Sequence, residues 1–208
     1  MTWPTALPLV AILRGITPVE AVAHARAVLD AGFDAIEVPT NSPDWALSVK
    51  AIVALAPQAL VGAGTVLSTA DLDQLQTAGG RLAVSPHIDT ALVTECARRG
   101  FVAVPGAMTP SEVFAAWHAG ATAVKIFPAG TLGTAHVKAL RAVLPADLPL
   151  LAVGGVSPAN LADYLRAGCA GAGLGSELYR PGQAPETTAA NASAFVAAYH
   201  AAFRAVKP

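Results

Sequence analysis

Short runs of apolar residues alternate along the chain with longer segments in which apolar residues recur every three or four positions. The short runs lie at 8–13, 35–39, 60–66, 82–86, 101–105, 123–127, 149–153 and 171–174. Continuous apolar runs of this length, bounded by turn residues, are typical of strands that are buried on both faces. The longer segments have the 3.6-residue period of amphipathic helices. The pattern therefore predicts strands and helices in strict alternation.

The predicted helices cover 18–31, 44–56, 69–78, 90–99, 110–119, 134–144, 158–167 and 186–205. Several of them carry the residues that usually mark helix ends. Pro18 stands at the start of the first helix and Gly32 directly after its end, which is the usual asymmetry of these two residues. Ser68 and Asp89 precede the third and fourth helices, where their side chains can accept hydrogen bonds from free backbone N–H groups.

Eight strand–helix pairs follow one another without a linker or a low-complexity segment. Strands that alternate with helices pair in parallel through right-handed crossovers, and eight such units close into a (β/α)8 barrel. An open doubly wound sheet is the alternative, but it would be expected to carry Gly-x-Gly-x-x-Gly after its first strand. Residues 13–17 read Leu-Arg-Gly-Ile-Thr instead. We therefore predict an α/β protein with one compact (β/α)8 TIM barrel over residues 1–208.

Composition excludes several classes of partner. Hydrophobic residues make up 54% of the chain, yet no apolar run approaches the length that a bilayer requires, so we expect no membrane partner. The net charge of −1 gives no support for nucleic-acid binding. The N-terminus lacks the basic and apolar regions of a signal peptide, and Cys96 and Cys169 suit buried, reduced thiols. These features predict a cytoplasmic protein.

Lys125 stands in the middle of the apolar run 123–128, which reads Ala-Val-Lys-Ile-Phe-Pro. A buried ammonium group is costly unless it is paired or loses its proton, so burial should lower the pKa of this lysine. A neutral, desolvated lysine is a nucleophile for carbonyl carbon atoms. The alternative is a lysine at a strand end whose amine reaches solvent. We interpret Lys125 as a candidate catalytic residue.

Further polar residues lie at the carboxyl ends of predicted strands, where barrels of this type carry their chemistry. Arg14, Glu37 and Thr65 mark the first three strands. Strand side chains alternate, so Glu37 and Lys125 both point into the barrel if their apolar neighbours pack outward. Glu37 then suits acid–base work and Arg14 suits a carboxylate or a phosphate. A structural carboxylate paired with an arginine is the alternative reading of Glu37.

The last two strand ends are rich in glycine. Gly154 and Gly155 follow the seventh strand, and Gly175 and Ser176 follow the eighth. In this fold the loops after strands seven and eight often bind phosphate through bare backbone amides, and glycine lets the backbone come close to the anion. Glycine turns also serve packing alone, but their occurrence at both positions predicts a phosphate site.

The five histidines, at positions 24, 87, 118, 136 and 200, lack the spacing of metal ligands. No set of histidines and carboxylates suits a divalent cation, so we predict no metal, and a metal-dependent aldolase is disfavoured. His87 follows a predicted strand end, and both a ligand contact and a plain surface position remain open for it.

Six segments of the chain resemble the KDPG/KHG class I aldolases, and the resemblance extends over essentially the whole sequence. The segments are 36–39, 61–67, 85–86, 125–128, 154–160 and 173–176. The resemblance implies a homotrimeric (β/α)8 enzyme that cleaves 2-keto-3-deoxy-6-phospho sugar acids without a cofactor. Lys125 would form a Schiff base with the C2 ketone, Glu37 would transfer protons, and Arg14 and Thr65 would hold the carboxylate. The remaining contacts would come from Pro86 and Phe127 to the pyruvyl part, and from Gly154, Gly155, Gly175 and Ser176 to the 6-phosphate.

Two positions bear on the configuration of the substrate at C4. Val153 precedes the paired glycines, where the phosphogluconate branch of this family tends to have a threonine whose hydroxyl can bond the C4 hydroxyl. Asn41 stands where that branch usually carries an arginine. Val153 therefore favours the galactonate epimer, with pyruvate and D-glyceraldehyde 3-phosphate as products, whereas Asn41 leaves Arg14 as the arginine near the substrate carboxylate. The alternatives are the gluconate epimer or both epimers, a sugar-phosphate isomerase or epimerase, and a non-catalytic sugar-phosphate binder.

Overall fold

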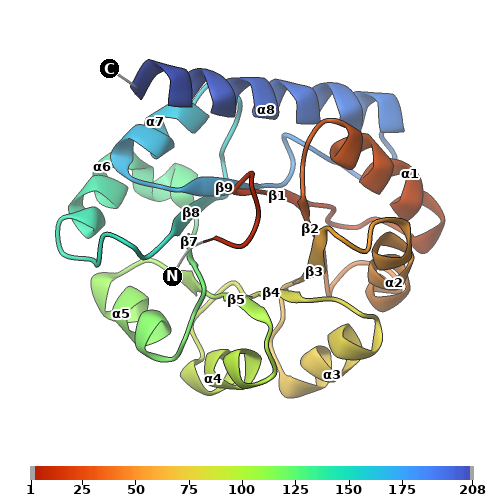
Figure 1. Ribbon diagram of the computed structural model, residues 1–208, viewed down its shortest axis with the longest axis horizontal. Helices are drawn as coiled ribbons and strands as arrows, with labels where there is room; N and C mark the ends of the chain where they lie inside the picture. The colour runs from red at the N-terminus through yellow and green to blue at the C-terminus, as the bar shows by residue number, and fades with distance from the viewer. Residues whose placement is uncertain (1–2, 207–208) are drawn as a thin grey trace.

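The computed structural model describes residues 3–206 and consists of a ring of parallel strands surrounded by helices (Figure 1). The strands are β1 (Leu9–Ile12), β2 (Ala35–Pro39), β3 (Leu60–Gly64), β4 (Leu82–Val84), β5 (Val102–Val104), β6 (Gly106–Ala107), β7 (Val124–Ile126), β8 (Leu150–Val153) and β9 (Gly171–Leu174). The helices are α1 (Pro18–Asp30), α2 (Trp45–Leu55), α3 (Thr69–Thr77), α4 (Thr90–Arg98), α5 (Pro110–His118), α6 (Ala129–Arg141), α7 (Leu161–Ala167) and α8 (Pro185–Val206).

The sheet closes on itself at Pro105. Its strand order is β5-β4-β3-β2-β1-β9-β8-β7-β6, and the two end strands, β5 and β6, are separated in the chain only by that proline. The N–H of Thr122, just before β7, donates to the carbonyl of Ala103 in β5 at 2.9 Å, which joins the two edges. Strands β5 and β6 are thus one barrel strand interrupted at a residue without an N–H. The predicted (β/α)8 barrel is confirmed.

Helix boundaries agree with the sequence except around α6 and α7. Ser68 accepts a hydrogen bond from the Asp71 N–H, and Asp89 accepts from two N–H groups, so both predicted caps are confirmed. The α6 segment starts at Ala129 rather than at 134, because a first helical turn precedes a kink at Gly133, whose φ is 76°. The α7 helix starts at Leu161 rather than at 158, because Ser157 donates its N–H to the Asn160 side chain in a preceding turn.

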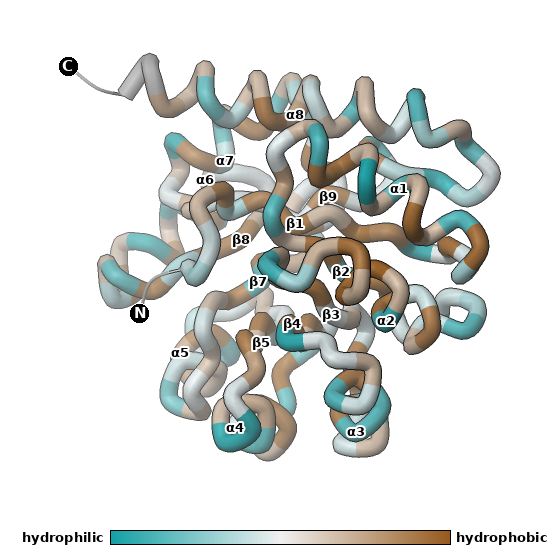
Figure 2. Tube along the Cα trace, turned by 45° about the vertical axis from the view of Figure 1, so that its right-hand side comes forward, coloured by the Kyte–Doolittle hydropathy of each residue, from teal (hydrophilic) through white to brown (hydrophobic). Residues whose placement is uncertain are grey.

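Two apolar layers hold the barrel together. The larger layer lies between the strands and the helices, and hydrophobic colour follows the strands in Figure 2 while the outer faces of α3 and α4 are polar. The smaller layer fills the barrel interior with Val10, Leu60, Leu82 and Leu151 among its members. Trp3 packs against this inner layer, and the N-terminal segment crosses the ring of strands in Figure 1. The amino end of the barrel is therefore filled with apolar groups, and polar groups gather at the carboxyl end.

Within residues 3–206, no helix combines the length and the apolar character that crossing a membrane requires. Cys96 and Cys169 are both buried and unpaired.

Candidate active site

A cavity of about 160 Å³ opens at the carboxyl ends of the strands. Every residue that the sequence singled out as a site residue lines this cavity except Glu37. Glu37 lines a second space of about 10 Å³ directly inside the barrel, and Lys125 lines both spaces. Lys125 therefore lies between the open cavity and the buried carboxylate.

Glu37 points into the barrel because its strand neighbours point outward. Ile36 and Val38 belong to the layer between strands and helices, so the alternation of β2 directs Glu37 inward. The residue is only 2% exposed, and among residues 3–206 its Oε2 atom has no hydrogen-bond partner. Gly64 of β3 makes room for the carboxylate, because a Cβ at position 64 would overlap the Glu37 carboxyl oxygens. An unpaired buried carboxylate of this kind is costly and typical of a functional site.

Lys125 occupies the corresponding place in β7. Val124 and Ile126 pack outward, and Lys125 is 6% exposed. Its Nζ atom lies 4.5 Å from the centre of the Phe127 ring, so the ring forms one wall of the amine's surroundings. The ammonium group is held in apolar surroundings, as the sequence predicted for this position.

Burial moves the pKa values of both groups toward neutrality. Desolvation raises the pKa of Glu37 to about 7, although the nearby charges of Lys125 and Arg14 oppose the shift. Desolvation lowers the pKa of Lys125, opposed by Glu37 and reinforced by Arg14. A carboxyl group with a pKa near 7 can both accept and return a proton at neutral pH. An amine with a lowered pKa is available as a nucleophile.

Arg14 and Thr65 line the cavity from the loops after β1 and β3, and strand β2 lies between these two strands in the barrel. Arg14 follows β1, is exposed, and donates from Nη1 to the Asn41 side-chain oxygen at 2.7 Å. Thr65 follows β3 and has a φ of 56°, a left-handed conformation that β-branched residues rarely adopt. These two residues bring a guanidinium group and a strained peptide unit to one side of the cavity.

Another part of the cavity wall is built from the glycine turns after β8 and β9, and β9 pairs with β1 in the barrel. Gly154 and Gly155 have φ values of 89° and 76°, which suit only glycine without strain. The Asn160 side chain donates to the Gly155 carbonyl at 3.0 Å and so fixes this turn. After β9, the N–H groups of Leu178 and Tyr179 both donate to the Gly175 carbonyl, which makes a helical turn beside the cavity.

Sequence reasoning missed Glu177, which also lines the cavity. It lies in the turn directly after Ser176, and its Oε1 is 3.4 Å from Nη2 of Arg180 in an exposed ion pair. Its position next to the glycine turn was the available signal. His87 is exposed and does not line the cavity, and its carbonyl accepts a hydrogen bond from the Ser85 hydroxyl. Across the described part of the chain, no three His, Cys, Asp or Glu side chains are grouped in a way that could hold a metal ion.

Known proteins match this chain along almost its whole length. The family model for KDPG and KHG aldolases matches residues 4–191. The chain is 54% identical to 2-dehydro-3-deoxy-6-phosphogalactonate aldolase of Escherichia coli strain K12, over 97% of this chain and 99% of that protein. It is 48% identical to a probable 2-dehydro-3-deoxy-6-phosphogalactonate aldolase of Rhizobium meliloti, over 96% of this chain and 95% of that protein.

Two solved structures extend the comparison. The structure titled native KDPGal superposes with a TM-score of 0.96 at 54% identity, over 98% of this chain and 100% of that one. A KDPG aldolase from Legionella pneumophila, with pyruvate captured as a covalent carbinolamine intermediate, superposes with a TM-score of 0.80 at 25% identity. That match covers 96% of this chain and 99% of the other. The chain therefore belongs to the family of KDPG and KHG aldolases, which are carbon–carbon lyases.

Proposed function

We propose that this protein is a class I aldolase that cleaves 2-dehydro-3-deoxy-6-phosphogalactonate to pyruvate and D-glyceraldehyde 3-phosphate. The observation that carries the proposal is the buried pair at the barrel mouth. Lys125 and Glu37 line one small space, and burial moves the pKa values of both toward neutrality. In a structural ion pair the carboxyl group stays ionised and the amine stays protonated at neutral pH. The shifted pKa values of Glu37 and Lys125 instead allow these two groups to transfer a proton.

Substrate binding uses the two sides of the cavity. Arg14 and Thr65 hold the carboxylate end, and the backbone amides of the glycine turns hold the 6-phosphate. Pro86 and Phe127 pack against the pyruvyl part. This orientation places the C2 ketone within reach of the Lys125 amine, because Lys125 lines the same cavity as both anion sites.

The lysine forms the first covalent bond. The neutral Lys125 amine attacks C2, and the resulting carbinolamine loses water with Glu37 as the proton carrier. The product is an iminium ion, which attracts electrons from the adjacent carbon–carbon bond. The Legionella aldolase is described with pyruvate bound as a carbinolamine, which supports the same first step for this chain.

Cleavage follows from the iminium ion. Glu37 takes the proton of the C4 hydroxyl group, directly or through a water molecule, and the C3–C4 bond breaks. The bonding electrons move into the iminium and leave an enamine, while the aldehyde departs as glyceraldehyde 3-phosphate. Protonation of the enamine at C3 and hydrolysis of the new iminium release pyruvate and restore the free lysine.

The proposal of the galactonate epimer as substrate is based on the side chain at position 153. Val153 lines the cavity and presents only methyl groups, so it offers no hydrogen bond to a C4 hydroxyl. The two relatives at 54% and 48% identity are named for the galactonate compound, which supports the same choice here. The gluconate epimer is the alternative substrate.

Trapping with pyruvate and sodium borohydride tests the imine. A reduced pyruvyl adduct is expected on Lys125, located by peptide mass spectrometry, and it should be absent from the Lys125→Arg variant. Lys138→Arg is the matched control, because Lys138 is exposed on α6. An adduct on another lysine, or no adduct in the wild-type protein, would remove Lys125 from the chemistry. A sugar-phosphate isomerase or a plain binding protein would release no pyruvate.

A pyruvate-release assay with each C4 epimer tests the substrate. The galactonate compound should have the higher kcat/KM, and Val153→Thr should shift the ratio toward the gluconate compound by adding a hydroxyl group. A strong preference of the wild-type enzyme for the gluconate compound would reverse the assignment.

We also propose that the enzyme works as a homotrimer in the cytoplasm. Large apolar side chains such as Val19, Leu47 and Phe203 are more than half exposed, which supports burial against other copies of the chain. The two buried, unpaired cysteines suit a reducing compartment. Light scattering should give a mass of three chains, and a monomer at micromolar concentration would contradict the proposal.

A further inference from the structure

Three consecutive residues after β2 reach the loops on both sides of them. Thr40 donates its N–H to the Gly64 carbonyl at 2.8 Å and its hydroxyl to the Thr65 carbonyl at 2.6 Å. Asn41 accepts from Arg14, and the buried Ser42 hydroxyl accepts from the N–H of Gly15 at 2.9 Å. One short segment therefore contacts the loop after β1 and the loop after β3.

The contacts of Thr40 determine the backbone conformation of Thr65. The carbonyls of Gly64 and Thr65 belong to the two peptide groups that flank the Cα atom of Thr65, and Thr40 donates to both. The second of these peptide groups also donates its N–H, that of Val66, to the Val84 carbonyl at 3.0 Å. Fixing both peptide planes fixes φ and ψ. A β-branched residue persists at a φ of 56° only when its surroundings enforce that conformation.

The contacts of Asn41 and Ser42 fix the other loop. Ser42 holds the backbone at Gly15, and Asn41 holds the guanidinium group of Arg14 at 2.7 Å. An amide oxygen orients a guanidinium group without neutralising its charge. A carboxylate at position 41 would instead form an ion pair and compete with an incoming anion for the same donors.

We propose that Thr40, Asn41 and Ser42 are positioning residues that set the places of Arg14 and Thr65 and thereby determine recognition of the substrate carboxylate. This inference rests on the proposed function, in which Arg14 and Thr65 bind that carboxylate. The segment begins three residues after Glu37 on the same strand end. The residues that position the carboxylate contacts and Glu37, the proposed proton carrier, therefore belong to one short stretch of backbone.

The first test distinguishes the effect of the Thr40 hydroxyl group from the effect of the branched shape of its side chain. Thr40→Val keeps the branched shape and loses the hydrogen bond to Thr65, and Thr40→Ser keeps the hydroxyl. Borohydride trapping is measured with pyruvate and with hydroxyacetone, a ketone without a carboxylate. Thr40→Val should raise the pyruvate concentration for half-maximal trapping about tenfold, the effect of roughly one lost hydrogen bond, and should leave hydroxyacetone trapping unchanged. Thr40→Ser should restore the wild-type value.

Controls and contrary outcomes make this test decisive. Thr94→Val removes a hydroxyl that donates to the Thr90 carbonyl on the surface of α4, and it should change neither reaction. If Thr40→Val weakens trapping of both ketones equally, or of neither, Thr40 does not position a carboxylate site. A Thr40→Ser variant that behaves like Thr40→Val would contradict the role of the hydroxyl as well.

The second test concerns the charge at position 41. Asn41→Asp should raise KM for the phosphorylated keto acid and the half-maximal pyruvate concentration roughly tenfold by pairing with Arg14. It should leave kcat and hydroxyacetone trapping near the wild-type values. Gln76→Glu adds the same charge at an exposed position of α3 and should have no effect. An unchanged KM in Asn41→Asp would overturn the assignment of Asn41.

Trapping in the wild-type protein distinguishes failure of the proposed function from failure of the positioning role. If wild-type protein forms no adduct on Lys125, the proposed function and the positioning role fall together. If the adduct forms and the variants at positions 40 and 41 behave like wild type, the aldolase stands and only the positioning role fails.

Discussion

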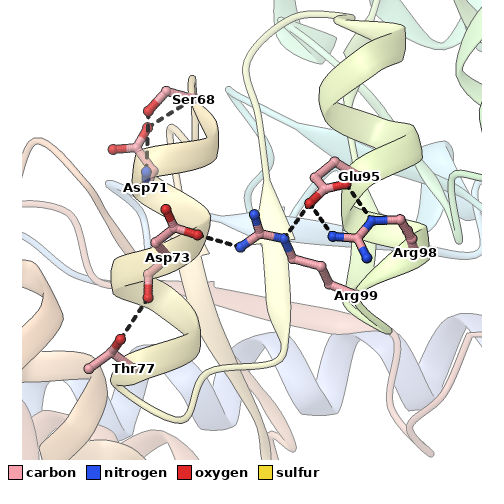
Figure 3. Close-up of polar contacts among 7 residues, drawn as sticks. All are labelled: Ser68, Asp71, Asp73, Thr77, Glu95, Arg98 and Arg99. Atoms are coloured by element: carbon pink, nitrogen blue, oxygen red, sulfur yellow. Dashed lines mark hydrogen bonds and ion pairs between the residues drawn. The ribbon is translucent and has the colours of Figure 1, made fainter.

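Two glutamates in different regions of this protein have opposite properties. Glu37 lies inside the barrel, where burial raises its pKa to about 7 and leaves one oxygen without a hydrogen-bond partner. Glu95 lies on the surface of α4, where hydrogen bonds from Arg98 and Arg99 lower its pKa to about 2. Figure 3 shows that Arg99 also reaches Asp73 of α3, at 2.5 Å, so this surface group links two helices.

The difference in pKa shows which environment keeps a carboxylate charged and which lets it exchange a proton. At the surface, guanidinium donors satisfy the carboxylate, so its charge is fixed and its protonation state carries no chemistry at neutral pH. In the barrel, desolvation by burial outweighs the nearby charges of Lys125 and Arg14 and raises the pKa of the carboxyl group to about 7, so its proton is exchangeable near neutral pH. The buried arrangement costs stability and the surface arrangement does not, which is expected where a site is built for reaction.

The largest expected effect comes from removing the buried carboxylate. Glu37→Gln should lower kcat in the pyruvate-release assay by roughly 10²–10⁴-fold, because the amide cannot carry a proton. Borohydride trapping of pyruvate on Lys125 should persist at least in part, since the amine remains. Glu95→Gln is the matched control and should leave kcat near the wild-type value. Near-normal turnover in Glu37→Gln would assign the proton transfer to another group.

A smaller effect is expected when the carboxylate is displaced instead of removed. Gly64→Ala places a Cβ where the Glu37 carboxyl oxygens lie, so the side chain or the strand must shift. We expect kcat to fall at least about tenfold, because catalytic groups tolerate little misplacement. Gly100→Ala is the control at a distance from the site: a Cβ there meets open space, and the φ of 78° adds backbone strain that should lower stability but leave kcat unchanged. Equal kcat values in the two variants would contradict the tight packing around Glu37.

The barrel and the inward direction of Glu37 and Lys125 follow from local sequence patterns. The alternation of apolar runs and amphipathic segments predicts the strand–helix repeat, because each run must bury both faces. A lysine between Val124 and Ile126 and a glutamate between Ile36 and Val38 point inward by the two-residue period of strands. The turn after β8 is also visible in the sequence, because the positive φ values of Gly154 and Gly155 suit only glycine without strain.

The features that the sequence does not predict depend on contacts between loops that are distant in sequence. The kink at Gly133 and the interruption at Pro105 have no unique local signature, because glycine and proline also end elements outright. The left-handed conformation of Thr65 is enforced by Thr40, which lies 25 positions away. The sequence offers threonine at both places without indicating that they meet. Such contacts appear only once the strands are placed side by side.

Glu37 and Glu95 should change the free energy of unfolding in opposite directions as the pH rises. The folded-state pKa of Glu37, about 7, lies above its ordinary value of 4.5, so the folded protein binds more protons between these values. Its contribution is present below pH 4.5 and is lost as the pH rises through 7, by about 3 kcal/mol. Urea unfolding of the wild type should show this decline between pH 5 and 8, and Glu37→Gln should remove it.

Glu95 should show the opposite dependence in a separate pH range. Its folded-state pKa of about 2 lies below 4.5, so its contribution is present above pH 4.5 and is lost as the pH falls toward 2. Glu95→Gln should therefore flatten the acid side of the stability curve and leave the range from pH 5 to 8 unchanged. A decline between pH 5 and 8 that persists in Glu37→Gln would mean that another group titrates there.

The smallest effect is expected from the surface arginines themselves. Arg98 contacts Glu95 within α4, whereas Arg99 also bridges to Asp73 of α3. Arg99→Gln should therefore lower the urea midpoint slightly more than Arg98→Gln, and both variants should keep wild-type kcat. Because exposed pairs are screened by salt, the difference should shrink when the unfolding is repeated at high ionic strength. A difference that persists in salt would indicate that Arg99 stabilises the α3–α4 contact through packing of its side-chain stem rather than through its charge.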